Sequence, residues 1–180
     1  MSDSLITSVG LFWHADAVFW GSQKKPGSLL GRPAKKKRDG STDFRDQVGI
    51  YVLYADYAIV YAGQTGSGSQ KLLYRLRQHR SDDLAERWNR FSWFGVRRVL
   101  GGGKLSKEKS AFHPSLPTVL NHVEAVLIHA AEPTMNGQGG RFGSNVTRYL
   151  QVRDKRLGPT DHEMLSALHK TVDDHDDRDS

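Results

Sequence analysis

Short runs of β-branched and aromatic residues in the middle of the chain predict a β-hairpin. Residues 49–55 (GIYVLYA) and residues 58–63 (AIVYAG) both have the composition of buried strands. Asp56 and Tyr57 separate the two runs, and two residues are enough for a tight turn. A third strand is expected over residues 91–100, FSWFGVRRVL.

Helical spacing of apolar positions predicts the remaining elements. Helices are expected over residues 71–80, 82–90, 115–131 and 161–172. In the first of them, Leu72, Leu73 and Leu76 lie together and can anchor the helix to the sheet. The order hairpin, helix, strand, helix predicts a small α/β (α+β) domain with a three-stranded, largely antiparallel sheet flanked by helices.

Two further segments precede this core. Residues 9–20 hold two aromatic runs around a polar centre, which indicates a small hairpin whose tryptophans pack against the main domain. Residues 24–45 are rich in lysine, arginine, glycine and proline and have the composition of a loop or linker. The predicted division is a hairpin and basic arm at 1–47, a core domain at 48–150, and a helix with an acidic tail at 151–180.

Charge favours a polyanionic partner. The 180 residues include 26 Lys and Arg against 20 Asp and Glu, a formal net charge of +6. Such a balance is typical of nucleic-acid binding, although plain solubility explains it equally well on charge alone. The expected backbone contacts in the arm are Lys35, Lys36, Lys37 and Arg38. Lys104 and Lys107, in the loop from Gly101 to Phe112, are further candidates.

The absence of cysteine excludes disulfides and zinc sites built on thiolates, and it suits a reducing compartment. The N-terminal residues MSDSLITSVG lack the basic and apolar regions of a secretory leader, and no apolar run is long enough to cross a bilayer. The chain is therefore expected in the cytoplasm.

Glu124 is the first candidate for chemistry. On the helix predicted over 115–131 it points in nearly the same direction as Leu120, Leu127 and Ile128, which predicts a carboxylate inside an apolar stripe. A buried carboxylate must be protonated, ion-paired or bound to a metal. An ion pair with a neighbouring arginine and a metal site both satisfy this requirement.

Arg75 and His79 are the second candidate. Their i, i+4 spacing places both on one face of the helix predicted over 71–80. Together with a carboxylate they would suit phosphoryl transfer, which needs positive charge at the phosphate and a proton acceptor. A solvent-facing pair on a basic helix is the simpler alternative.

The order of these residues resembles the GIY-YIG nuclease superfamily. Gly49-Ile50-Tyr51 is followed by Tyr61-Ala62-Gly63, with alanine where the second motif usually has isoleucine or valine. Arg75 to His79 resembles the helix motif of the family, Glu124 its later glutamate, and Pro133 to Asn136 the proline and asparagine that follow. The similarity covers roughly residues 48–140. Separate structural explanations, such as core aromatics for the two tyrosines, would have to coincide at six positions.

The resemblance implies a role for each matched residue. Tyr51 would act as the general base or orient the attacking water, and Tyr61 would form hydrogen bonds within the site. Arg75 would neutralise the phosphoryl oxygens. His79 would assist proton movement or contact the phosphate.

The resemblance also implies a metal ion. Glu124 would be the sole protein carboxylate on one Mg²⁺ or Mn²⁺ ion, and Asn136 would fix the local backbone or the substrate. Gln64, Thr65 and Arg77 are expected contacts with DNA. The implied products are a 5′-phosphate and a 3′-hydroxyl.

The resulting prediction is a metal-dependent DNA endonuclease, with RNA as an alternative substrate. A restriction-type enzyme that reads a site is slightly favoured over a repair, mobile-element or defence nuclease. The competing hypothesis is a nucleic-acid-binding module or complex subunit that keeps the fold without the chemistry.

Overall fold

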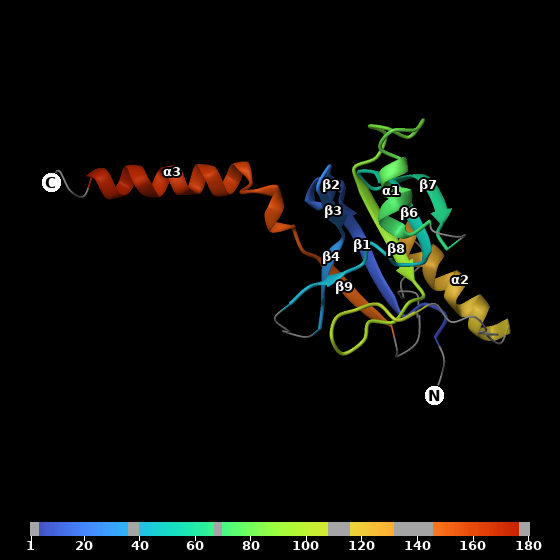
Figure 1. Cartoon of the computed structure of the whole chain (residues 1–180). Helices are drawn as coiled ribbons and strands as arrows, with labels where there is room; N and C mark the ends of the chain where they lie inside the picture. Colours follow the sequence, from blue (N-terminus) through green and yellow to red (C-terminus); the bar gives the residue numbers. More distant parts are fainter. Residues whose placement is uncertain (1–3, 36–39, 67–69, 108–115, 132–145, 177–180) are drawn as a thin grey trace.

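The fold is α+β, with a mixed seven-stranded sheet and three α-helices (Figure 1). The computed structural model describes residues 4–35, 40–66, 70–107, 116–131 and 146–176. The strands are β1 (Ser8–His14), β2 (Phe19–Ser22), β3 (Lys25–Ser28), β4 (Leu30–Pro33), β5 (Thr42–Asp43), β6 (Gly49–Ala55), β7 (Ala58–Gln64), β8 (Arg90–Gly95) and β9 (Thr147–Gln151). The helices are α1 (Leu72–Gln78), α2 (Leu116–Ala131) and α3 (Asp161–Asp176).

The predicted central hairpin and third strand are confirmed. β6 pairs antiparallel with β7 through the turn at Asp56 and Tyr57, and β8 pairs antiparallel with the other edge of β6. Asp56 adopts a positive φ of 54°, which aspartate tolerates in turns. The side-chain amide of Asn89 stabilises this turn through two hydrogen bonds of 2.7 Å. Its oxygen accepts the backbone N–H of Asp56, and its nitrogen donates to the Asp56 carboxylate.

The predicted number of strands is wrong, because the sheet has seven strands and not three. The strand order is β5-β4-β9-β1-β8-β6-β7, so the three expected strands form only one end. β1 pairs antiparallel with β8 and parallel with β9. Gly10 permits this approach, since a Cβ there would lie 2.2 Å from Nε1 of Trp93. The free edge of β8 is thereby covered, which removes an exposed row of backbone donors and acceptors.

The N-terminal strands β1, β4 and β5 are therefore part of the seven-stranded sheet, and β2 and β3 form a separate two-stranded sheet. The predicted hairpin over 9–20 is wrong, because β1 pairs with β8 whereas β2 pairs with β3. The basic stretch 24–45 is not a plain linker, because it contains β3, β4 and β5. Its glycines serve close packing: a Cβ on Gly27 would lie 2.7 Å from the Phe19 carbonyl, and one on Gly31 would lie 2.7 Å from the Trp13 ring.

The expected short helix over 82–90 is also wrong. This stretch forms turns that lead into β8. The Asp82 carboxylate accepts the backbone N–H of Leu84 at 2.9 Å, a local bond that competes with helical pairing. Glu86 then adopts a positive φ of 61°, which is incompatible with a continuing helix.

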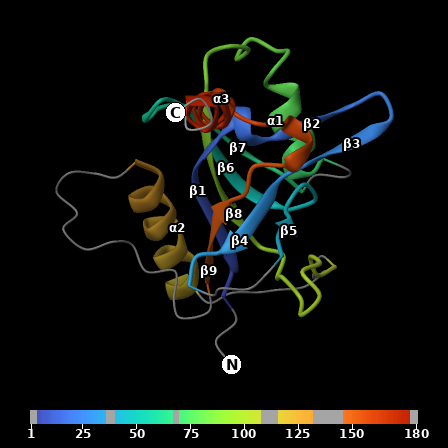
Figure 2. The same ribbon diagram turned by 90° about the vertical axis from the view of Figure 1, so that its left-hand side faces the viewer.

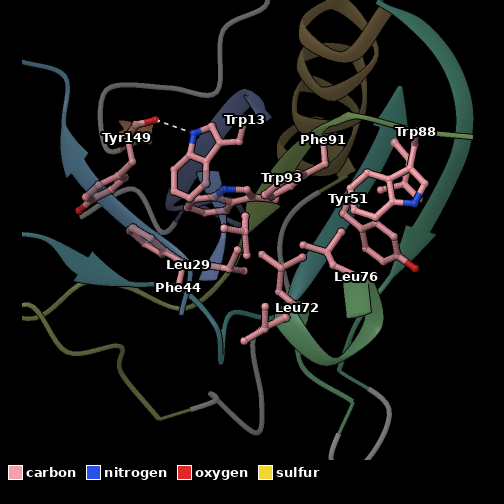
Figure 3. Packing of buried hydrophobic residues seen from close by; sticks show 13 residues of the cluster. Trp13, Leu29, Phe44, Tyr51, Leu72, Leu76, Trp88, Phe91, Trp93 and Tyr149 are labelled. Atoms are coloured by element: carbon pink, nitrogen blue, oxygen red, sulfur yellow. Dashed lines mark hydrogen bonds between the residues drawn. The ribbon is translucent and has the colours of Figure 1, made fainter. Parts of the chain in front are cut away.

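Both faces of the sheet are covered, and side chains alternate between two cores. One core, which α1 closes, contains Tyr51, Leu53 and Trp93, together with the confirmed helix anchors Leu72, Leu73 and Leu76 (Figure 3). The other core, under α2, contains Val52, Tyr54 and Phe94. Helices α1 and α2 therefore lie on opposite faces of the sheet (Figure 2). None of the described helices is long and apolar enough to cross a membrane.

Asp154 joins the chain after β9 to the β2–β3 hairpin. Its buried carboxylate accepts from the Ser28 hydroxyl at 2.5 Å and from the Arg156 guanidinium at 2.6 Å. Hydrogen bonds from Arg156, despite burial, and from Ser28 hold the pKa of Asp154 well below its usual range. The carboxylate is therefore ionised and fully bonded at neutral pH.

Replacing Asp154 with alanine is expected to lower the free energy of unfolding by about 1–3 kcal/mol at pH 7, since Ser28 loses its buried acceptor. The folded pKa is depressed, so this contribution is complete above the pKa of an unfolded carboxyl, declines as the pH falls below that value, and is lost as the pH falls through the folded pKa. Urea unfolding of wild type, Asp154→Ala and the exposed control Asp161→Ala at pH 7 and at about pH 3 measures the effect. An equal loss at both pH values would contradict it.

Candidate functional site

Four of the predicted site residues meet on the α1 side of the sheet. Tyr51 comes from β6 and Tyr61 from β7, and Arg75 and His79 come from α1 and its end. The ring centroids of Tyr61 and His79 are 4.7 Å apart, and those of Tyr51 and Tyr61 are 6.1 Å apart. The two strand tyrosines, which the resemblance implied, and the two helix residues, which share a helix face, thus form one cluster.

A chain of two short hydrogen bonds runs through this cluster. The Tyr51 hydroxyl lies 2.7 Å from Nε2 of His79, and Nδ1 of His79 lies 2.6 Å from the Asp82 carboxylate. A carboxylate can only accept, so Nδ1 carries a proton. In the neutral imidazole Nε2 then accepts the proton of the Tyr51 hydroxyl. The histidine is thereby set as a base towards Tyr51.

Asp82 is a member of the site that the sequence prediction missed. The backbone N–H of Leu84 and the His79 imidazole, acting against partial burial, hold the pKa of Asp82 below its ordinary value. It is therefore an ionised partner whose hydrogen bond orients the His79 ring. The i, i+3 spacing of His79 and Asp82 is visible in the sequence, but the helix expected over residues 82–90 assigns Asp82 to a separate element.

Tyr51 keeps its proton at neutral pH. Burial raises the pKa of Tyr51 to about 12, although the positive charge of the neighbouring Arg75 acts in the opposite direction. Gly63 lies against the phenol, since a Cβ there would be 2.5 Å from the Tyr51 oxygen. Figure 3 shows the Tyr51 hydroxyl pointing away from Trp93. A tyrosinate base is thus unavailable at neutral pH, and Nε2 of His79 is the atom placed to accept the Tyr51 proton.

The cluster is partly buried and partly exposed to solvent. Tyr51 is 0% and His79 4% exposed, whereas the Asp82 side chain is 43% exposed and Tyr61 and Arg75 are half-buried. Arg75 donates to the Gln78 amide at 2.7 Å, and its buried Nε–H finds no acceptor in the described part of the chain. A buried donor on a cation is costly when unpaired, so it is suited to receive an anionic oxygen.

Glu124 does not join this cluster. It is exposed on α2, and α2 packs on the opposite face of the sheet from Tyr51. The expectation of a carboxylate inside a buried stripe is wrong, because the helix buries Ala125, Ala130 and His122 instead. Small alanines let the helix approach the sheet closely, so the leucine side of the helix is left outward.

The described residues do not bring together the magnesium ligands that the resemblance implies. Glu124 is remote from the tyrosines, and Asn136 lies outside the described residues. In the described ranges no group of three or more His, Asp or Glu side chains is arranged to hold a metal ion. Asp82 is the acidic side chain that contacts the cluster, and its bond to His79 already occupies one oxygen.

The predicted DNA contacts are dispersed over the surface. Lys35, Lys104, Lys107 and Gln64 are exposed, whereas Lys36, Lys37 and Arg38 lie outside the described residues. Thr65 has a structural bond, because its hydroxyl accepts the Gly49 N–H at 3.0 Å. Arg77 donates to the Trp20 carbonyl and so ties α1 to β2.

The raised pKa of Tyr51 predicts a loss of stability at alkaline pH. The folded state favours the neutral phenol, so its contribution is complete below about pH 10 and is lost as the pH rises towards about 12. Urea unfolding between pH 9 and 11.5 should show a decline for wild type that is shallower in Tyr51→Phe. The exposed control Tyr57→Phe should follow wild type, and parallel curves for all three would contradict the prediction.

Comparison of the chain with protein-family models, with curated proteins and with solved structures finds no match in any of the three. The cluster of Tyr51, Tyr61, Arg75, His79 and Asp82 therefore has to supply the functional conclusion through its own chemistry.

Proposed function

We propose that the protein is an endonuclease that hydrolyses phosphodiester bonds in DNA, with RNA as an alternative substrate. The hydrogen-bonded chain from Asp82 through His79 to Tyr51, beside the Arg75 cation, is the observation that carries this proposal. It combines a proton acceptor with a group that neutralises a phosphate, which are the two needs of phosphodiester hydrolysis. The resemblance to the GIY-YIG nucleases and the net charge of +6 point the same way.

In the proposed reaction the phenol relays a proton. A water on the solvent side of the cluster attacks the phosphorus and gives its proton to the Tyr51 oxygen, while the Tyr51 proton passes to Nε2 of His79. Asp82 stabilises the imidazolium that forms. The bond from phosphorus to the 3′ oxygen breaks, that oxygen takes a proton from solvent, and the products are a 5′-phosphate and a 3′-hydroxyl.

Arg75 and Tyr61 position the phosphate in this scheme. The free Nε–H of Arg75 would donate to a non-bridging phosphoryl oxygen, which gains charge as the water attacks. Tyr61 lies half-buried against His79 and would line the entrance to the buried Tyr51. Some opening between Tyr61 and Gly63 has to accompany substrate binding, because Tyr51 is fully buried.

Dependence on Mg²⁺ or Mn²⁺ is part of the proposal and comes from the resemblance alone. The transfers through Tyr51 and His79 do not require a metal ligand at Glu124. Measuring DNA cleavage by the Glu124→Ala variant tests whether Glu124 belongs to the working site. Loss of cleavage with intact folding would place α2 in the working site, and unchanged cleavage would restrict the site to the Tyr51 face.

A nucleic-acid-binding module without cleavage is the second candidate function. The burial of both Tyr51 and His79 and the distance of Glu124 favour it. The two candidates differ in turnover and not in binding, so a binding assay alone does not separate them.

The test is cleavage of supercoiled plasmid, short single-stranded DNA and single-stranded RNA, with Mg²⁺, Mn²⁺ or excess chelator. Wild type is compared with Tyr51→Phe and with the exposed control Tyr57→Phe. Cleavage by wild type and Tyr57→Phe, but not by Tyr51→Phe, supports the proposal. Discrete plasmid fragments would indicate a site-reading, restriction-type enzyme. Binding without cleavage under every condition would overturn catalysis in favour of the binding module.

A further inference from the structure

An apolar stripe on α2 lies open to solvent. Leu116, Leu120, Val123 and Leu127 are between 50% and 70% exposed. Their spacing of four, three and four residues places them on one side of the helix, which is the pattern of a seam between packed helices. The stripe is separate from the side of α2 that rests on the sheet through Ala125 and Ala130.

Helix α3 has a matching apolar side. Met164, Leu165 and Leu168 are between 47% and 63% exposed, and every residue from 161 to 170 is exposed. The helix projects from the body of the molecule (Figure 1). An isolated helix of 16 residues is marginally stable in water, so a packing partner would stabilise it.

Helix α3 does not pack on the α2 stripe of its own chain, because the two lie on different sides of the molecule. Arg156, just before α3, donates to the Pro26 carbonyl at 3.1 Å, and its guanidinium lies 4.0 Å from the centre of the Phe19 ring. These contacts fix the start of α3 at the β2–β3 hairpin, which α1 contacts through Arg77 and Trp20. Helix α2 covers the opposite face of the sheet (Figure 2).

Charge favours contact between the helix and the body of another copy. Residues 161–180 contain seven acidic and two basic residues, whereas residues 1–160 contain 24 basic and 13 acidic residues. Like copies would therefore attract each other when the acidic C-terminal segment of one approaches the basic body of the other.

We propose that two copies of this chain exchange α3, so that Met164, Leu165 and Leu168 of each copy pack on the Leu116–Leu127 stripe of the other. The exchange is reciprocal, so it closes as a twofold dimer and covers both apolar faces in both copies. It is independent of cleavage, because none of these side chains belongs to the Tyr51 cluster.

The first test is the oligomeric state of the full chain over a range of concentrations, by sedimentation equilibrium. Wild type is expected to dimerise, and Leu120→Lys or Leu168→Lys to raise the dimer dissociation constant by at least about tenfold. The matched controls are Asn121→Lys on α2 and Ser166→Lys on α3, which are exposed and lie off the stripes. A wild type that stays monomeric, or controls that dissociate equally, would overturn the proposal.

Mixing identifies which helices meet. When Leu120→Lys is mixed with Leu168→Lys, an exchanged heterodimer has one contact with both faces intact, so dimer should reappear. If α2 paired with α2, only Leu120→Lys would weaken the dimer. If α3 paired with α3, only Leu168→Lys would weaken it. A mixture that remains monomeric, or a dimer that only one variant weakens, would therefore contradict the exchange.

Discussion

Replacing His79 with alanine is expected to slow phosphodiester cleavage by about 10²–10⁴-fold, the usual contribution of a positioned general base. Nε2 of His79 lies 2.7 Å from the Tyr51 hydroxyl, so this replacement removes the proposed acceptor of the Tyr51 proton. The measurement is the single-turnover rate on the DNA that wild type cuts best.

Asp82→Asn is the companion variant, because His79 is buried and its loss could also disturb folding. The asparagine amide can donate to Nδ1, which would favour the tautomer whose Nε2 carries the proton and cannot accept from Tyr51. We expect slower cleavage with little change in the unfolding midpoint, because the Asp82 side chain is 43% exposed. Normal rates in Asp82→Asn at every pH would exclude the proton relay, even if His79→Ala were inactive.

Replacing Trp13 with alanine is expected to lower the free energy of unfolding of the whole chain by about 3–5 kcal/mol. Trp13 on β1 is 2% exposed and packs edge-on against Phe44, Phe91 and Trp93 (Figure 3). Its indole N–H also donates to the Tyr149 carbonyl at 3.2 Å. The ring therefore joins β1 to strands that lie far away in the sequence.

The control is Leu150→Ala on β9, where the side chain is 37% exposed and a small loss is expected. Urea unfolding is followed by far-UV circular dichroism and by tryptophan fluorescence. One cooperative transition, shifted strongly by Trp13→Ala, would show that β1 and the β6–β8 region unfold together. Two transitions, with the larger one unmoved, would support an independent N-terminal segment over residues 1–47.

The interpretation of the sequence was most accurate where neighbouring residues decide the structure. The turn at Asp56 and Tyr57, the strands on either side of it, and α1, α2 and α3 follow from periodicity and turn composition. The shared face of Arg75 and His79 followed from helical spacing, whereas the meeting of Tyr51 with His79 was implied only by the resemblance to a known family.

The sequence did not determine which helix face packs on which sheet face, or which strands lie next to each other in the sheet. Glycines that resemble linker residues at 27 and 31 are close-packing positions, a role that depends on the distant rings and carbonyls that approach them. α2 is apolar on two sides, so periodicity could not tell that its alanine side covers the sheet and that Glu124 stays outside. Asp82 entered the site because its own carboxylate ends the helical pairing that the composition suggested.

The sequence by itself thus determined the local elements and the shared face of Arg75 and His79, because backbone geometry over a few residues fixes which side chains share a face. The two tyrosines were assigned to the same site only through the resemblance to a known family. Only the tertiary structure decided that β1, β4, β5 and β9 extend the sheet to seven strands, and that α2 lies on the face away from Tyr51. The pairings of β1 with β8 and of β4 and β1 with β9 join residues more than 50 positions apart, such as Gly10 with Trp93, and no local pattern records their energies.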